Sequence, residues 1–157
     1  MSEAAVPILG PDVFTVERPV RFAMCDPAGI MYFPNYFDLF NGLIEDWLAE
    51  LGFGWAETIP NRRFTTPIVH ASCDYLRPSR MGDRLHLAAL LTRLGRRSLE
   101  LSIPVWSGEE LRARGRMVHV AISLETYQSL DWPDDLHAAL EAYRAACAAP
   151  GPDGAEP

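Results

Sequence analysis

One aspartate in a short turn-forming run is the residue of this sequence best suited to chemistry. Asp26 stands in the run Cys25-Asp26-Pro27-Ala28-Gly29-Ile30, in which Pro, Ala and Gly favour a tight turn. A carboxyl group with an ordinary pKa of about 3.9 is ionised at neutral pH. Such a group is suited to nucleophilic attack and less suited to proton abstraction, although burial would raise its pKa and favour the second role. Taken alone, an Asp before such a turn is more often a turn or cap residue.

The other reactive side chains are weaker candidates. Cys25 lies next to Asp26, but no His or Lys is adjacent in the sequence to activate its thiol, so we interpret it as a small packing residue. His70 and His119 fall within expected strands, where a single His is more often a hydrogen-bonded structural residue than a catalyst.

Length and composition narrow the class of protein. The 157 residues suit one domain with a single core, and 48% hydrophobic with 22% charged residues is typical of a globular domain. A net charge of -7 argues against a nucleic-acid binder, which usually has a basic stripe. The three Cys show neither a Cys-x-x-Cys nor a His-Cys spacing, which argues against a disulfide framework and a metal site. There is no signal-peptide pattern and no apolar run of membrane-spanning length, so we expect a cytoplasmic protein without membrane contacts.

The hydrophobic pattern predicts one long helix over about residues 34–51. Pro34 suits the first turn of a helix, and Gly52 suits its C-terminal cap. Large apolar side chains recur there at three- and four-residue spacing: Tyr36, Phe40, Leu43, Trp47 and Leu51. The apolar stripe is wide, so we expect the helix to be largely surrounded by other elements.

Most of the remaining pattern indicates antiparallel strands. The expected strands are 13–22, 65–76, 84–94, 98–106 and 111–127, the last four following one another as hairpins, and a short helix is expected over 133–146. Pro19 in the first strand predicts an edge position or a bulge. We therefore expect an α+β fold in which a curved antiparallel sheet wraps the long helix. Its edges invite pairing with a second subunit.

The ends of the chain differ in composition from this domain. Residues 1–12 are expected to form a flexible arm, and residues 13–147 the single domain. The Pro-, Gly- and Ala-rich stretch 148–157 cannot bury apolar surface, so we expect it to be disordered.

The segment 22–37 resembles the signature of the 4-hydroxybenzoyl-CoA thioesterase family, a branch of the hotdog-fold acyl-CoA thioesterases. The family pattern is Cys-Asp-Pro-Ala-Gly-Ile, two or three residues that often include aromatics, and then Pro-Asn-Tyr. Here the pattern reads Cys25-Asp26-Pro27-Ala28-Gly29-Ile30, Met31-Tyr32-Phe33 and Pro34-Asn35-Tyr36. A second segment, Thr66-Pro67-Ile68-Val69, resembles the family's second strand. The order of helices and strands is similar over residues 13–140.

The resemblance implies a hotdog fold and hydrolysis of an acyl-CoA substrate without a cofactor. It also implies a homodimer or homotetramer with the active site at the subunit interface. By the same resemblance Asp26 is the catalytic carboxylate, and the backbone N–H of Phe33 polarises the thioester carbonyl. Arg96 and Arg97 resemble the basic cluster that holds the nucleotide phosphates.

The chemistry of thioester hydrolysis is consistent with these roles. The unpaired N–H groups at a helix start are rigid donors for a carbonyl oxygen that gains negative charge, and Pro34 has no N–H, which leaves Phe33 and the residues just before it as donors. Tyr32, ahead of the helical stripe, and Thr66, with its hydroxyl, are candidates for the substrate pocket.

This sequence departs from the family pattern at three places. Met24 replaces a small or acidic residue, Tyr32-Phe33 replaces a common Trp-Tyr pair, and Gly95 replaces a third basic residue. The acyl group therefore stays open. We expect an aromatic, hydroxybenzoyl-type group, and the alternatives are a short aliphatic group or a non-catalytic acyl-CoA binding protein.

Overall fold

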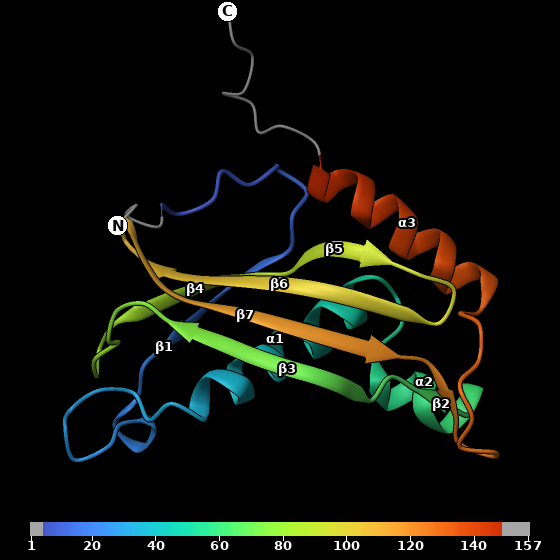
Figure 1. Cartoon of the computed structure of the whole chain (residues 1–157), viewed down its shortest axis with the longest axis horizontal. Helices are drawn as coiled ribbons and strands as arrows, with labels where there is room; N and C mark the ends of the chain where they lie inside the picture. Colours follow the sequence, from blue (N-terminus) through green and yellow to red (C-terminus); the bar gives the residue numbers. More distant parts are fainter. Residues whose placement is uncertain (1–4, 149–157) are drawn as a thin grey trace, which may run out of the picture.

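Helix α1 (Asn35–Glu50) runs along one face of a curved antiparallel sheet (Figure 1). The computed structural model describes residues 5–148. Residues 5–12 of the expected arm contain no helix or strand, and Ala148 is the last residue of a helix. The rest of the expected disordered tail lies outside the described residues. The α+β fold with a long helix against a curved sheet is confirmed.

The main sheet has the strand order β1-β4-β6-β7-β3, and β5 pairs with β6. Its strands are β1 (Thr15–Pro19), β3 (Ile68–Tyr75), β4 (Arg84–Ala88), β5 (Leu90–Leu94), β6 (Ser98–Ser107) and β7 (Glu110–Val120). A separate pair joins β2 (Phe64–Thr65) to β8 (Ile122–Ser123). Pro19 lies in an edge strand, as predicted, because β1 pairs only with β4 among the described strands.

The predicted hairpin succession is wrong at one strand. β3 does not pair with the next strand along the chain but lies on the far side of β7, where Ile68 is opposite His119 and Tyr75 is opposite Ala113. The chain then returns across the sheet to place β4 beside β1. β3 is therefore an edge strand, and every residue in it is exposed or half-exposed.

The predicted boundaries of the long helix are confirmed to within one residue. Pro34 caps its start and Gly52 follows its end with a φ of 87°, a left-handed conformation that glycine adopts readily. The aromatic residues at positions 36, 40 and 47 are buried in the core. Phe40 packs on Gly115 of β7, and a Cβ added there would lie 2.7 Å from the Phe40 ring.

Two further helices complete the fold. α3 (Asp134–Ala148) was predicted and packs on β5, with Leu136, Leu140 and Tyr143 buried. α2 (Trp55–Arg62) was not predicted, because it has only eight residues and contains Pro60. Within residues 5–148, no helix is long and apolar enough to cross a membrane.

Candidate active site

Asp26 lies in a small backbone ladder between β1 and α1. Its N–H donates to the Ile30 carbonyl at 2.9 Å, and its Oδ1 accepts the Ala28 N–H at 2.8 Å. Gly29 completes the turn with a φ of 76°. The Tyr32 N–H donates to the Met24 carbonyl at 2.8 Å, so the two arms of the loop run antiparallel. Asp26 is half-exposed, and this loop holds its backbone in a defined position.

The Phe33 backbone N–H is an available donor at the start of α1. The next residue, Pro34, has no N–H, and the N–H groups of Asn35, Tyr36 and Phe37 already donate to carbonyls three residues back. Among residues 5–148 the Phe33 N–H has no hydrogen-bond partner. It is therefore the one donor in this helix start that is left for an external acceptor.

A groove of about 470 Å³ lies beside this helix start. Its lining is mostly apolar and comprises Ile30, Met31, Phe33, Tyr36, Tyr75, Leu76, Arg77, Pro78 and Ser79. The Tyr75 hydroxyl donates to the Phe33 carbonyl at 3.1 Å, which fixes the loop to the end of β3. The buried hydroxyls of Tyr36 and Ser79 are 2.8 Å apart. Tyr32 is 50% exposed and its ring stands edge-on to Phe33, 5.2 Å between ring centres.

Arg96 and Arg97 lie in the β5–β6 turn, and both are anchored by the carboxylate of Asp131. Arg96 Nη2 and Arg97 Nε donate to the two oxygens of Asp131 at 2.6 and 2.7 Å. Arg97 and then Arg96 hold the pKa of Asp131 below its ordinary value. Both guanidinium groups remain largely exposed, so their free N–H groups can reach an anion in solvent.

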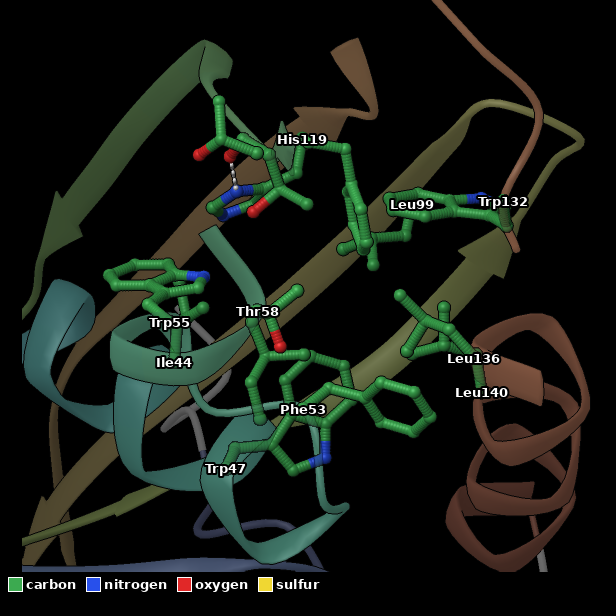
Figure 2. A pocket seen from close by; sticks show the side chains of 14 residues that line it. Ile44, Trp47, Phe53, Trp55, Thr58, Leu99, His119, Trp132, Leu136 and Leu140 are labelled. Carbon is green, nitrogen blue, oxygen red and sulfur yellow. Dashed lines mark hydrogen bonds between the residues drawn. The ribbon is translucent and has the colours of Figure 1, made fainter. Parts of the chain in front are cut away.

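Thr66 and His119 form a second polar group at the other end of β3. His119 Nδ1 is 2.8 Å from the Thr66 carbonyl oxygen, and burial is the main cause that lowers the pKa of His119. The expectation that His119 is a hydrogen-bonded structural residue is right for Nδ1 only. Its Nε2 is buried and has no partner among the described residues. Figure 2 shows this histidine at the edge of a cavity that Trp55 also lines.

Within one chain the candidate residues fall into two groups. Asp26, Tyr32 and Phe33 are in the loop tied to the Tyr75 end of β3. Thr66 lies at the Ile68 end of β3, and the β5–β6 turn with its two arginines lies at this same end, where the Ala121 N–H donates to the Arg97 carbonyl at 2.8 Å. Figure 1 shows the β1–α1 loop and the β5–β6 turn at opposite ends of the sheet.

Sequence reasoning missed Tyr75, Ser79 and Trp55. The pairing of Tyr75 with Phe33 and of Tyr36 with Ser79 joins positions more than forty residues apart, and no local pattern signals either contact. Trp55 belongs to the helix that was not predicted. No group of three or more His, Cys, Asp or Glu side chains in residues 5–148 is arranged to hold a metal ion.

The chain and its fold are similar to known thioesterases. The family model described as the thioesterase-like superfamily matches residues 20–140. The 1,4-dihydroxy-2-naphthoyl-CoA hydrolase of Nostoc punctiforme is 31% identical over 131 residues, which cover 83% of this chain and 88% of the relative. The corresponding hydrolase of Synechocystis is 30% identical over 129 residues, which cover 81% and 94%.

Solved structures agree with this relationship. The crystal structure of a 1,4-dihydroxy-2-naphthoyl-CoA thioesterase from Synechocystis matches with a TM-score of 0.76 at 28% identity, covering 82% of this chain and 95% of that one. A gentisyl-coenzyme A thioesterase matches in fold, with a TM-score of 0.73 at 24% identity, covering 78% and 98%. The chain belongs to the thioesterase-like superfamily and has the hotdog fold. By class it is a thioester hydrolase.

Proposed function

We propose that this protein hydrolyses the CoA thioester of a hydroxyl-bearing aromatic acid, with Asp26 as the catalytic carboxylate. The observation that carries this proposal is the unpaired Phe33 N–H at the start of α1, on the same loop as Asp26 and beside an apolar groove. A thioester carbonyl bound to that N–H would gain stabilisation as negative charge develops on its oxygen. The relatives named for a CoA thioester of an aromatic acid support the choice of substrate class.

Asp26 has two possible roles in this reaction. As a nucleophile, its carboxylate attacks the carbonyl carbon, the CoA thiolate leaves, and water then hydrolyses the resulting mixed anhydride. As a general base, it takes a proton from a water molecule that attacks the carbonyl directly. In both cases the Phe33 N–H binds the oxyanion and no cofactor is needed.

A second copy of the chain would unite the two groups of site residues. The eight residues of β3 rise about 3.3 Å each, so its two ends lie about 23 Å apart, too far for one carbonyl to touch both. Antiparallel pairing of two β3 edges would bring the Phe33 loop of one protomer to the partner's Thr66 and Arg96–Arg97 end. Exposed apolar side chains on β3, such as Val69 at 62%, favour this pairing.

The proposed substrate class is broader than 4-hydroxybenzoyl-CoA alone. The curated relatives reported above are named for a two-ring acyl group, 1,4-dihydroxy-2-naphthoyl. Both acyl groups are aromatic and carry hydroxyls, and this shared chemistry defines the proposed substrate class. The anchored arginines are suited to the phosphates of CoA in either case.

The test is thiol release from a panel of CoA thioesters by wild-type protein and the Asp26→Asn variant. We expect turnover of 4-hydroxybenzoyl-CoA or 1,4-dihydroxy-2-naphthoyl-CoA and a loss of at least about a thousandfold in the variant, with the fold intact by circular dichroism. Asp38→Asn is the matched control, because Asp38 is exposed in the first turn of α1. Turnover of butyryl-CoA alone would indicate the aliphatic alternative. No release from any thioester would indicate a binding protein.

A further inference from the structure

One cavity holds most of the buried polar atoms that lack a hydrogen-bond partner within residues 5–148. In residues 5–148, five buried side-chain nitrogen or oxygen atoms lack a hydrogen-bond partner. Four of them belong to residues that line the same cavity: Trp47 Nε1, Trp55 Nε1, Thr66 Oγ1 and His119 Nε2. Folded proteins satisfy nearly all such atoms with protein, water or ligand partners, so these four atoms along one cavity are candidates for contacts with a bound molecule.

The cavity has an inner and an outer part. The inner part, about 20 Å³, lies among α1, α2 and α3 and is shown in Figure 2. The outer part is a groove of about 300 Å³ at the Ile68 end of β3. Trp55, Thr65, Thr66 and His119 line both parts, so they form the boundary between them. The groove is large enough for a small planar group, whereas the inner part has room for little more than one polar atom.

The hydrogen bonding of His119 defines what this boundary can bind. The Thr66 carbonyl can only accept, so the His119 Nδ1 beside it carries the proton. The side chain is 1% exposed and its pKa is lowered by burial, so the ring is neutral at pH 7. The remaining nitrogen, Nε2, is therefore a buried acceptor without a donor. Trp55 Nε1–H is a buried donor without an acceptor on the same cavity.

The group that satisfies both atoms must donate one hydrogen bond and accept another. A ligand hydroxyl does this, as does a water molecule when no ligand is bound, whereas a carboxylate cannot donate and an ammonium cannot accept. The described residues that line the two parts include no Asp, Glu, Lys or Arg, which also favours a neutral group. Aromatic and aliphatic side chains form most of the walls, and Figure 2 shows Leu136 and Leu140 across the cavity from Trp55 and His119.

We infer that Trp55, Thr66 and His119 form a subsite for a hydroxyl on the aromatic acyl group. The hydroxyl donates to His119 Nε2 and accepts the indole N–H of Trp55, while the Thr66 hydroxyl supplies a further polar contact. This subsite rests on the proposed function, because it takes the ring of a thioester whose carbonyl is bound at the partner's Phe33. It makes these three residues determinants of acyl specificity, and His119 binds substrate without taking part in the chemistry.

The test compares matched substrates that differ only in their hydroxyl groups. Steady-state kcat/KM is measured for 4-hydroxybenzoyl-CoA against benzoyl-CoA, and for 1,4-dihydroxy-2-naphthoyl-CoA against 2-naphthoyl-CoA. We expect wild-type protein to prefer the hydroxylated thioester by about tenfold or more in at least one pair. Trp55→Phe and Thr66→Val should each reduce that preference several-fold. The ratio cancels any general loss of stability, because both substrates are measured on the same variant.

Matched controls and a binding measurement complete the experiment. Trp106→Phe and Thr92→Val make the same chemical changes away from the cavity and should leave the preference unchanged. Calorimetry with 4-hydroxybenzoate and benzoate, and with 1,4-dihydroxy-2-naphthoate and 2-naphthoate, measures the preference without turnover. If no thioester is hydrolysed but a hydroxy acid binds more tightly, and the Trp55 variant removes this difference, the proposed function fails and the subsite stands. No preference in wild type, or an unchanged preference in both variants, would overturn the subsite.

Discussion

The Tyr75 phenol donates a hydrogen bond of 3.1 Å to the Phe33 carbonyl and so ties the free edge of the sheet to the start of α1. The two rings also meet edge-on, with 6.2 Å between their centres. Burial raises the pKa of Tyr75 to about 12, so the phenol keeps its proton at working pH. The N–H and the carbonyl of Phe33 belong to adjacent peptide units. Because the Tyr75 hydrogen bond fixes the carbonyl, it also restricts the direction of the N–H.

Tyr75→Phe should lower kcat while changing KM little. The variant keeps the ring contact and loses one hydrogen bond, worth about 1 kcal/mol, which corresponds to a fall of about five- to tenfold if that bond holds the oxyanion donor in place. Steady-state kinetics on the preferred thioester measures this. Tyr127→Phe is the control, because the Tyr127 side chain is 72% exposed. Wild-type kcat in Tyr75→Phe would mean that the loop is positioned without this bond.

Val69→Lys should prevent two protomers from pairing through β3 and so keep the two groups of site residues apart. Val69 projects from the exposed edge strand β3, and a charge on such an edge opposes pairing with a second copy. We expect sedimentation velocity to show a smaller species and thioester turnover to be lost with it. Gln128→Lys adds the same charge in an exposed turn and should keep both assembly and turnover. A fully active monomer would contradict a site shared between protomers.

Local patterns predicted the elements of this fold better than their arrangement. The apolar residues from Tyr36 to Leu51 recur at helical spacing and so predicted a helix, and Gly52 predicted where it ends. The place of β3 beside β7 depends on pairing between distant segments, which the two-residue period of a strand does not encode. The short α2 went unpredicted because Pro60 lies in its last turn.

In the candidate site, too, the sequence predicted residues that are close along the chain better than contacts between distant segments. Asp26 and Phe33 are close in sequence, and the turn between them keeps them in one loop, so a motif identifies them together. Arg96 and Arg97 were placed in the same site by resemblance, yet within one chain they lie at the other end of the sheet. The acceptor on His119 follows from its bond to the Thr66 carbonyl, a contact between residues 53 positions apart. Such a contact depends on the folded chain and leaves no local signal.

Replacing both Arg96 and Arg97 with Gln should raise KM for CoA thioesters by about tenfold or more and leave kcat nearly unchanged. Within one chain the two side chains are far from Asp26, and their proposed role is to hold the phosphates of CoA, where a charge-assisted hydrogen bond contributes roughly 1.5–3 kcal/mol. A thioester of N-acetylcysteamine lacks those phosphates, and its KM should not change. Arg144→Gln removes one charge from an exposed position of α3 as a control. An equal rise in KM for the truncated thioester would exclude phosphate binding.

Acidification below about pH 6.5 should destabilise the protein through His119. Burial lowers the pKa of this imidazole in the folded state, so the unfolded chain, with an ordinary pKa of about 6.5, binds the proton first. The free energy of unfolding therefore falls as pH drops through that value, by up to about 1 kcal/mol between pH 6.5 and 5.5 if the folded ring stays neutral. Urea unfolding at both pH values measures this loss. His119→Phe should show a smaller dependence on pH, at lower stability throughout, because the Thr66 carbonyl loses its donor. NMR titration of the wild-type imidazole gives an independent check, and protonation of folded His119 at its ordinary pKa would contradict the prediction.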